Sequence, residues 1–391
     1  MYFPKNLADK LETRKHNKSL RTLPHPNDLI DFASNDYISF SRSEGIFNAT
    51  HQFLLDHNIK CNGATGSRLL SGNHTLYTKT ENYIAEFHQS EAALIFNSGY
   101  DVNVGFFSAV PQRNDIILYD EFCHASIRDG IQLSNAKAYK FKHNDFEDLE
   151  KLILKFTVEH SLFTIYIITE SVFSMDGDCP NMEELVALAE KYNCYLVVDE
   201  AHGLGVFGKK GEGLLQFLGL HNRVFARIMT FGKGLGCHGA VILGSTELKS
   251  YLINFARSFI YTTGLSPHSV ATIFVAYQQL EIEKETIENL RQNIVYFNQQ
   301  KKLFGLQPLF VRSKSAIQSV IIPGNEKVKN IASALQQNGF DVKAILSPTV
   351  PDGQERLRFC LHSYNSKEEM TQVLTLLSNF VFDDNQSGII K

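Results

Sequence analysis

The sequence lacks the patterns that mark disulfide-rich, metal-binding or membrane-spanning proteins. Its six cysteines include no Cys-x-x-Cys pair, and its fourteen histidines include no His-Glu-x-x-His spacing. We therefore expect free thiols in a reducing cytoplasm and no metal site. Apolar runs such as Tyr195–Val198 are short, and no apolar segment followed by a cleavage site occurs near Met1. We accordingly expect neither a membrane span nor a signal peptide.

An excess of charge of either sign is also missing. The formal net charge is -4, hydrophobic residues make up 43% of the chain, and charged residues make up 20%. These values are ordinary for a globular protein. We therefore expect neither a nucleic-acid partner nor a membrane-surface partner. The length of 391 residues is enough for a large core and more than one lobe.

From about residue 92 to residue 198, apolar strands alternate with helices. Near-continuous apolar strands separated by helices are typical of a parallel sheet that is covered on both faces. The pattern predicts an α/β fold whose large domain has a mostly parallel sheet flanked by helices. The expected strands include residues 92–96, 115–119, 164–169 and 195–198, and the expected helices include residues 75–89, 99–109, 145–156 and 182–192.

A different pattern follows in the last third of the chain. One long amphipathic helix is expected over residues 266–303, and shorter strands and helices after it indicate a smaller α+β domain. We predict an N-terminal segment of residues 1–40, a large domain of residues 41–285 and a small domain of residues 286–391. The polar tail at residues 383–388 is expected to be frayed.

Polar and glycine-containing segments follow the predicted strands of the large domain. Ligands of open α/β sheets bind at the carboxyl ends of the strands. The sequence therefore predicts a binding site at that edge of the sheet. The segments are Ser98-Gly99-Tyr100, His124, Ser174, Asp199–His202 and Thr230–Lys233.

Lys233 has an unusual setting. An apolar run ends in Thr230-Phe231-Gly232-Lys233, and further glycines follow at positions 234 and 236. An exposed lysine on a helix needs no such setting, whereas a lysine that follows a buried strand points into a crevice. We interpret Lys233 as a lysine that forms a Schiff base.

An acid and a histidine lie at the end of another predicted strand. Asp199 directly follows the apolar residues of the strand, and His202 comes three residues later. A protonated pyridine nitrogen needs a fixed anion beside it, and such a carboxylate keeps the ring able to absorb electrons. Alone, Asp199 could equally be a helix cap or a metal ligand, and His202 could be a packed core histidine. Together with Lys233, Asp199 favours a pyridine-containing cofactor.

Two further segments suit such a cofactor. The segment Ser98-Gly99-Tyr100 opens a helix after a strand, where backbone N–H groups bind phosphate and glycine permits close approach. Thr230 could add a hydroxyl to the same phosphate. His124 could place a flat imidazole over an aromatic ring, or it could be a surface histidine in a loop.

A nucleotide-binding pattern in residues 234–239 is rejected. This segment fits G-x-G-x-x-G, but the dinucleotide motif requires a helix after the glycines. The residues that follow, Ala240–Gly244, instead have the composition of a strand. The chain also contains no G-x-x-x-x-G-K-[ST] phosphate loop. We therefore do not expect a nicotinamide or nucleotide cofactor.

With these segments in view, the chain resembles the α-oxoamine synthase family of fold-type I pyridoxal-phosphate enzymes, which are related to class II aminotransferases. The resemblance runs from about Leu20 to Leu377, nearly the whole chain. Its specific motifs are Ser34–Tyr37, Gly66–Arg68, Ser71-Gly72, His124–Ser126, Glu170–Asp178, Asp199–Gly203 and Thr230–Gly234.

The resemblance implies that pyridoxal 5'-phosphate is the cofactor and that Lys233 is bound to it. Asp199 would pair with the ring nitrogen, and His202 would bond the phenolic oxygen. His124 would stack on the ring, and Ser174 would lie beside it. The catalytic residues implied by the resemblance are Lys233, His124, Asp199 and His202.

The resemblance also implies how the phosphate and the substrates are bound. Residues Ser98-Gly99-Tyr100 and Thr230 would hold the phosphate, and Thr263 would reach the phosphate of a partner subunit in a homodimer. The carboxylate of the amino-acid substrate would be held by Asn35 and Arg358, and Arg21 would lie near the acyl substrate.

The implied activity is a decarboxylative condensation of an amino acid with an acyl thioester. The stretches Ser315–Gln318 and Pro348–Arg358 favour L-alanine and either pimeloyl-CoA or pimeloyl-acyl carrier protein, with a biotin precursor as product. The alternatives are glycine C-acetyltransferase, 5-aminolevulinate synthase and serine palmitoyltransferase, which belong to the same family, and more distantly an aminotransferase or a scaffold without activity.

Overall fold

The computed structural model of the chain describes residues 3–23, 28–159 and 164–382. The predicted frayed tail, residues 383–388, lies outside these ranges. The chain forms two compact units, which we describe separately. The larger unit consists of Asn35–Ser174 and Cys179–Leu290, and the smaller unit consists of Met1–Ser34, Met175–Asp178 and Arg291–Lys391. The domain boundaries after residues 40 and 285 stay a prediction.

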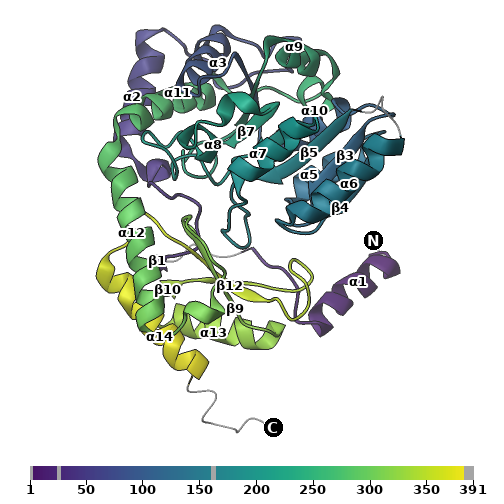
Figure 1. Ribbon diagram of the computed structural model, residues 1–391. Coiled ribbons are helices and arrows are strands. Elements are labelled where there is room, and N and C mark those ends of the chain that lie inside the picture. The colour runs from purple at the N-terminus through teal and green to yellow at the C-terminus, as the bar shows by residue number, and fades with distance from the viewer. Residues whose placement is uncertain (1–2, 24–27, 160–163, 383–391) are drawn as a thin grey trace. The chain divides into compact units, whose positions relative to one another are not determined.

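A seven-stranded sheet forms the centre of the larger unit (Figure 1). Six of its strands run in one direction, and β8 is antiparallel to both of its neighbours. The prediction of a mostly parallel sheet is therefore confirmed. In spatial order the strands are β2 (Ala92–Phe96), β8 (Ala240–Gly244), β7 (Ala226–Thr230), β6 (Tyr195–Asp199), β5 (Ile165–Glu170), β3 (Ile116–Asp120) and β4 (Lys137–Phe141).

Successive residues of a strand point to opposite faces of the sheet. Both faces of this sheet are covered by helices and lie in apolar cores. On β6, Val197 packs into one apolar core and its neighbours Leu196 and Val198 pack into the other. The first core is shared with α4 (Gly99–Ala109), α5 (Ala125–Gln132), α9 (Thr246–Phe255) and α10 (Arg257–Ile260). The second is shared with α6 (Phe146–Glu159), α7 (Met182–Lys191) and α8 (Leu214–Phe217).

The predicted single helix over residues 266–303 is wrong. The segment forms two helices, α11 (Pro267–Ile282) and α12 (Lys284–Leu303), with a break at Glu283. Glu283 has a ψ of 79°, which is not helical, and its carboxylate accepts hydrogen bonds from the backbone N–H and the hydroxyl of Thr286. The side chain thus satisfies an N–H group in the first turn of α12, as an N-cap does. Helix α11 packs against α2 (Glu44–Asp56) and α3 (Thr75–Phe87).

The smaller unit is the predicted α+β domain. Its main sheet is antiparallel, in the order β11 (Lys343–Ile345), β12 (Arg356–Cys360) and β9 (Ile317–Ile321). A short parallel pair, β1 (Ile30–Asp31) with β10 (Phe340–Asp341), ties the segment before Ser34 to this unit. Its helices include α1 (Lys5–His16), α13 (Asn325–Gln337), α14 (Lys367–Phe382) and the part of α12 from Arg291 on. Among the described residues of both units, short 3-10 turns occur at Phe40–Arg42, His221–Arg223 and Gln307–Leu309.

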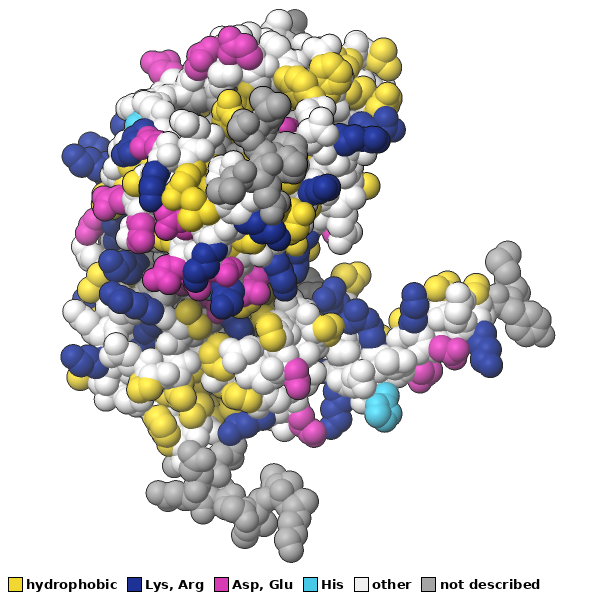
Figure 2. Space-filling view, turned by 45° about the vertical axis from the view of Figure 1, so that its right-hand side comes forward, with side chains coloured by type: hydrophobic (Ala, Val, Ile, Leu, Met, Phe, Trp, Pro, Cys, Tyr) yellow, Lys and Arg dark blue, Asp and Glu magenta, His cyan; other side chains and the backbone are white. Residues whose placement is uncertain are grey.

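The molecular surface carries charges of both signs. Figure 2 shows Lys and Arg side chains interspersed with Asp and Glu side chains over one face. This mixture agrees with the small net charge of -4. Within residues 3–23, 28–159 and 164–382, no helix is both long enough and apolar enough to cross a membrane.

Candidate active site

The predicted site residues of the larger unit follow the carboxyl ends of its parallel strands. Asp199 ends β6, Thr230 ends β7, and His124 and Ser174 lie in the segments after β3 and β5. The segment Ser98-Gly99-Tyr100 follows β2 and begins α4. The arrangement matches the general position of ligands in α/β sheets.

Lys233 lies in a tight loop between β7 and β8, which we call the lysine loop, residues 231–239. The loop is closed by hydrogen bonds from Phe231 N to Gly239 O (2.9 Å) and from Cys237 N to Phe231 O (2.8 Å). Gly236 has a φ of +64°, and a Cβ atom there would clash with the backbone of Ser41. Glycine is therefore required for the turn, and the loop holds Lys233 in a fixed place.

A chain of polar contacts leads from Lys233 into the core. Lys233 Nζ lies 2.8 Å from His202 Nε2, and His202 Nδ1 lies 2.6 Å from the Tyr37 hydroxyl. The Tyr37 hydroxyl also donates to Asn35 Oδ1 at 3.1 Å. His202 is 4% exposed, so its ring has a fixed orientation between Lys233 and Tyr37. The structure therefore brings three predicted residues, Lys233, His202 and Asn35, into one network.

Asp199 is buried and held on both carboxylate oxygens. Its Oδ2 accepts a hydrogen bond from Asn103 Nδ2 at 2.9 Å, and its Oδ1 accepts one from the backbone N–H of Ala201 at 2.9 Å. Asn103 belongs to α4, so this contact joins the end of β6 to the helix that begins at Gly99. Such anchoring fixes the direction in which the carboxylate can meet a positive charge.

The N-terminus of α4 forms a close junction with the end of β7. Ser98 caps the helix by accepting a hydrogen bond from the N–H of Asp101 at 3.1 Å. A Cβ atom added to Gly99 would lie 2.5 Å from Thr230 Oγ1. The absent side chain at Gly99 therefore leaves the backbone N–H groups and the Thr230 hydroxyl together, which is a setting suited to phosphate. The Tyr100 hydroxyl instead donates to Asp129 at 2.8 Å.

The sequence did not identify Glu170, the last residue of β5. Its carboxylate is 3% exposed and accepts a hydrogen bond from the backbone N–H of His124 at 2.6 Å. Burial, followed by the charge of Asp199, raises the pKa of Glu170 to about 8, whereas Lys233 acts in the opposite direction. The available signal was a carboxylate at the end of a mostly apolar strand.

The charges of Asp199 and Lys233 also affect the pKa of His124. Desolvation by the surrounding atoms lowers the pKa of His124, while Asp199 raises it and Lys233 lowers it again. Its Nδ1 lies 2.7 Å from the Ser126 hydroxyl, which fixes the rotation of the ring. The residue as a whole is nevertheless exposed, so a ligand can reach it.

Two further predicted residues, Thr263 and Arg358, lie in separate units. Asn97 Nδ2 donates to the carbonyl of Thr263, and the predicted reach of Thr263 to a partner subunit stays a prediction. Arg358 lies on β12 of the smaller unit, and its Nη1 lies 3.0 Å from Cys360 Sγ.

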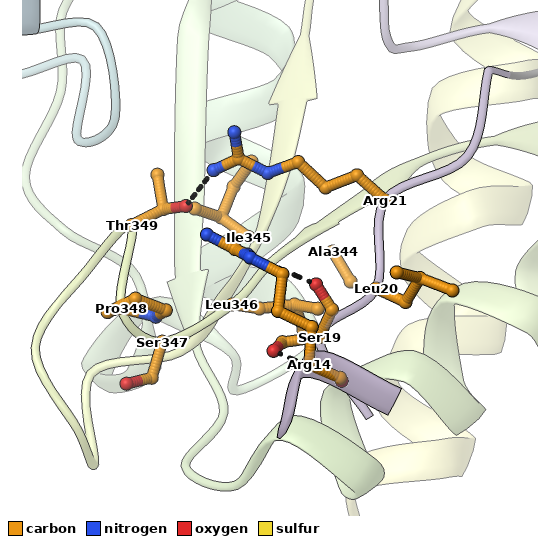
Figure 3. A pocket seen from close by; sticks show the side chains of 10 residues that line it. All are labelled: Arg14, Ser19, Leu20, Arg21, Ala344, Ile345, Leu346, Ser347, Pro348 and Thr349. Carbon is orange, nitrogen blue, oxygen red and sulfur yellow. Dashed lines mark hydrogen bonds between the residues drawn. The ribbon is translucent and has the colours of Figure 1, made fainter. Parts of the chain in front are cut away.

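Arg21 lines a cavity of about 250 Å³ in the smaller unit (Figure 3). Its guanidinium donates to the Thr349 hydroxyl at 3.3 Å, and Arg14 lines the same cavity. None of the ten described residues that line it is acidic. The two guanidinium groups therefore give this cavity a positive character that suits an anionic group.

Comparisons with known proteins now give the family. The chain matches the aminotransferase class I and II family over residues 27–377. It is 40% identical to 8-amino-7-oxononanoate synthase from Emericella nidulans over 377 residues, which covers 91% of this chain and 90% of that relative. The chain therefore belongs to the aminotransferase class I and II family.

Two solved structures are similar over almost the whole chain. The first, 8-amino-7-oxononanoate synthase from Francisella tularensis, has a TM-score of 0.78 and 28% identity, covering 92% of this chain and 100% of that chain. The second is a serine palmitoyltransferase from S. paucimobilis with bound PLP and myriocin. It has a TM-score of 0.87 and 24% identity, covering 97% of this chain and 98% of that chain, and this likeness shows the fold.

This protein is a PLP-dependent transferase of the condensing type, where PLP is pyridoxal 5'-phosphate. The residues of the larger unit fit that cofactor. An amine, Lys233, lies beside His202, and an anchored carboxylate, Asp199, lies at the next strand end. The junction of Gly99 and Thr230 leaves room that a Cβ atom would fill.

Proposed function

We propose that the enzyme condenses L-alanine with pimeloyl-CoA or pimeloyl-acyl carrier protein, releasing CO2, the free thiol carrier and 8-amino-7-oxononanoate, a precursor of biotin. The observation that supports the proposal is the anchored set of Lys233, His202 and Asp199. It occurs in a chain that is 40% identical to an 8-amino-7-oxononanoate synthase. When bound, PLP supplies an electron-withdrawing ring that stabilises negative charge on the amino-acid Cα.

The residues of the lysine network move the proton and hold the charge. Lys233 Nζ takes the Cα proton of alanine and later returns one to the same carbon. Asp199 keeps the pyridine nitrogen protonated, because its carboxylate cannot turn away from the two donors that hold it. His202 would bond the phenolic oxygen of the cofactor, and His124, which is exposed, would cover its ring.

Other residues bind the ends of the cofactor and of the amino acid. The phosphate is held by Ser98, Gly99, Tyr100 and Thr230, with Thr263 of one protomer reaching the phosphate of its partner in a homodimer. Ser174 would lie beside the ring of the bound cofactor. Asn35 and Arg358 hold the alanine carboxylate until it leaves as CO2. The proposed place of action is the cytoplasm.

The acyl donor is bound through an anionic group near Arg21. The cavity that Arg21 shares with Arg14 contains two guanidinium groups and no acidic lining residue among those described. The bond-forming step joins the alanine Cα to the carbonyl carbon of the thioester, and the thiol leaves with its electron pair. The carrier itself, CoA or acyl carrier protein, is distinguished by supplying the same acyl group on each.

Replacing Lys233 tests the central assignment. Lys233→Ala is expected to lose both the absorption band of lysine-bound PLP and turnover, because no other amine is assigned to the cofactor. Lys210→Ala is a matched control, since Lys210 lies in the same unit but pairs with Glu281 on the surface. A Lys233→Ala protein that keeps the band and turnover would overturn the proposal.

Serine palmitoyltransferase is the second candidate, because the structure of that enzyme from Sphingomonas wittichii matches this chain with 25% identity and a TM-score of 0.86. The two functions differ in amino acid and in acyl chain. Alanine, glycine and serine should each be tested with pimeloyl and palmitoyl thioesters. Selective turnover of alanine with the pimeloyl donor supports the first candidate, and selective turnover of serine with the palmitoyl donor supports the second.

A further inference from the structure

Tyr37 lies between two proposed functional residues, Asn35 and His202. The proposed function assigns no role to Tyr37 itself. Its side chain is completely buried in the larger unit. The hydroxyl lies between Asn35 Oδ1, at 3.1 Å, and His202 Nδ1, at 2.6 Å. His202 Nε2, on the far side of the ring, lies 2.8 Å from Lys233 Nζ. The four residues therefore form one continuous line of hydrogen bonds.

The direction of these bonds follows from counting hydrogens. A tyrosine hydroxyl has one hydrogen, and an amide oxygen can only accept. In the arrangement in which the Tyr37 hydrogen is donated to Asn35 Oδ1, the hydroxyl oxygen accepts from His202. The proton of the neutral imidazole is thus on Nδ1, which leaves a lone pair on Nε2 facing Lys233.

We propose that Tyr37 is a positioning residue that fixes the proton of His202 on Nδ1, so that Nε2 can accept a proton from Lys233. In this transfer an Nζ–H bond breaks, an Nε2–H bond forms, and the positive charge moves from the ammonium to the imidazolium. The Nδ1–H bond to Tyr37 is kept throughout. Lys233 becomes the neutral amine that must attack the aldehyde of PLP.

The direction of the hydrogen bond between His202 and Tyr37 does not depend on the substrates. The role of this bond in catalysis rests on the proposed function. A test of His202 and of cofactor uptake therefore separates the two. Failure of alanine or of pimeloyl thioester as substrate would leave this inference intact, and a wrong tautomer would leave the proposed reaction intact.

The direct test is the ¹⁵N NMR spectrum of histidine-labelled enzyme, measured with and without bound PLP. The signals of His202 are identified by their loss in His202→Gln, because the chain has 14 histidines. We expect a protonated Nδ1 in both forms of the natural protein. An unprotonated Nδ1 would overturn the proposal, and this measurement needs no Tyr37 variant to fold.

The Tyr37→Phe variant supplies the second measurement. Removing the hydroxyl leaves Nδ1–H without its acceptor, so we expect the proton to move to Nε2. We also expect PLP uptake, followed by the growth of its absorption band, to slow by about tenfold, the effect of one hydrogen bond of about 1.4 kcal/mol. Unchanged Nδ1 protonation together with unchanged uptake would contradict the proposal.

Tyr77→Phe is the matched control. Tyr77 is also almost fully buried in the larger unit, and its hydroxyl accepts a hydrogen bond from the N–H of Leu265 at 2.6 Å. Its loss should lower thermal stability to a similar extent as Tyr37→Phe. It should leave the His202 signals and the rate of PLP uptake unchanged. An equal effect of both variants on uptake would show a general packing defect and would overturn the proposal.

Discussion

Asp199 and Glu200 are neighbours in sequence and both are buried, yet their surroundings differ in kind. Glu200 accepts hydrogen bonds from Arg227 Nε (2.8 Å), Leu214 N (2.6 Å) and Leu215 N (3.2 Å). Its charge is therefore fully compensated by an arginine and by the first turn of α8. Asp199 instead has one amide and one backbone donor, and no positively charged side chain is among the partners described for it.

The difference shows how one strand end can serve stability and chemistry together. The side chain of Glu200 holds the chain after β6 against β7 and α8. The side chain of Asp199 is fixed in direction by Asn103, and the hydrogen bonds described for it include none from a positively charged side chain. A buried carboxylate in that condition is suited to pair with a charge that arrives with a ligand, such as a protonated pyridine ring.

The largest effect is expected for Asp199→Asn. The substitution keeps the shape of the side chain and removes the charge opposite the cofactor. Losing one partner of a buried ion pair costs about 3–5 kcal/mol, which corresponds to a fall in turnover of roughly 10²–10⁴-fold. The midpoint of thermal unfolding without PLP should fall only by the effect of one lost hydrogen bond, about 1 kcal/mol, because Asn has one acceptor oxygen for the two donors that hold Asp199. An Asp199→Asn enzyme with nearly full turnover would show that this acid does not serve the ring.

Glu200→Gln should have the opposite effect to Asp199→Asn, with a large loss of stability and a small loss of turnover. Arg227 is 2% exposed, so removing the charge of Glu200 leaves a buried guanidinium without its partner. We expect the free energy of unfolding, measured in urea, to fall by about 3–5 kcal/mol. Turnover per folded, PLP-loaded molecule should change far less than in Asp199→Asn. If both variants lose turnover equally, the division between the two acids is wrong.

Glu170 sharpens the comparison through pH. Its pKa is raised to about 8 in the folded chain, so between an unfolded pKa near 4.5 and pH 8 the folded state binds a proton that the unfolded state has lost. Stability therefore falls as pH rises through this window. Glu170→Gln should lose less stability than the natural chain between pH 5 and pH 8, by more than about 1.4 kcal/mol, the value of one pKa unit. If the free energy of unfolding, measured in urea on the two PLP-free proteins, fell by the same amount from pH 5 to pH 8, this prediction would be wrong.

The smallest effect is expected at the junction of Gly99 and Thr230. In Gly99→Ala the new methyl group would lie 2.5 Å from Thr230 Oγ1. Such crowding costs about 1–3 kcal/mol, and PLP should dissociate roughly tenfold more readily in a fluorescence titration. Gly63→Ala is the matched control, because no atom lies within 4 Å of the added methyl group. Equal affinity in the two variants would remove Gly99 from the phosphate site.

Most of the large sheet was predictable because its strands are continuous apolar runs. Strand β2 was expected at its observed bounds, and β5 and β6 within one residue. Strand β4 was missed, since Lys137 and Lys140 are exposed on this edge strand and interrupt the apolar pattern. The break at Glu283 was missed because it depends on a side-chain bond to Thr286, in a sequence that otherwise favours a continuous helix.

Site residues could be predicted from the sequence where the residue type and its position at a strand end indicate one kind of chemistry. Lys233 and Asp199 stood out for that reason. Glu170 and Tyr37 did not, because their importance comes from burial and from contacts with residues far away in sequence. Neither property can be derived from the spacing of residues along the chain.

The lysine loop limits how this enzyme could be altered by engineering. A Cβ atom at Gly234 would clash with the backbone of Leu204, and one at Gly236 with that of Ser41. Libraries that vary the length or side chains of this loop should therefore contain few folded members. Changes in substrate range are better sought at positions such as Leu20 and Thr349, where a cavity lies beside the residues and nothing essential to the turn is disturbed.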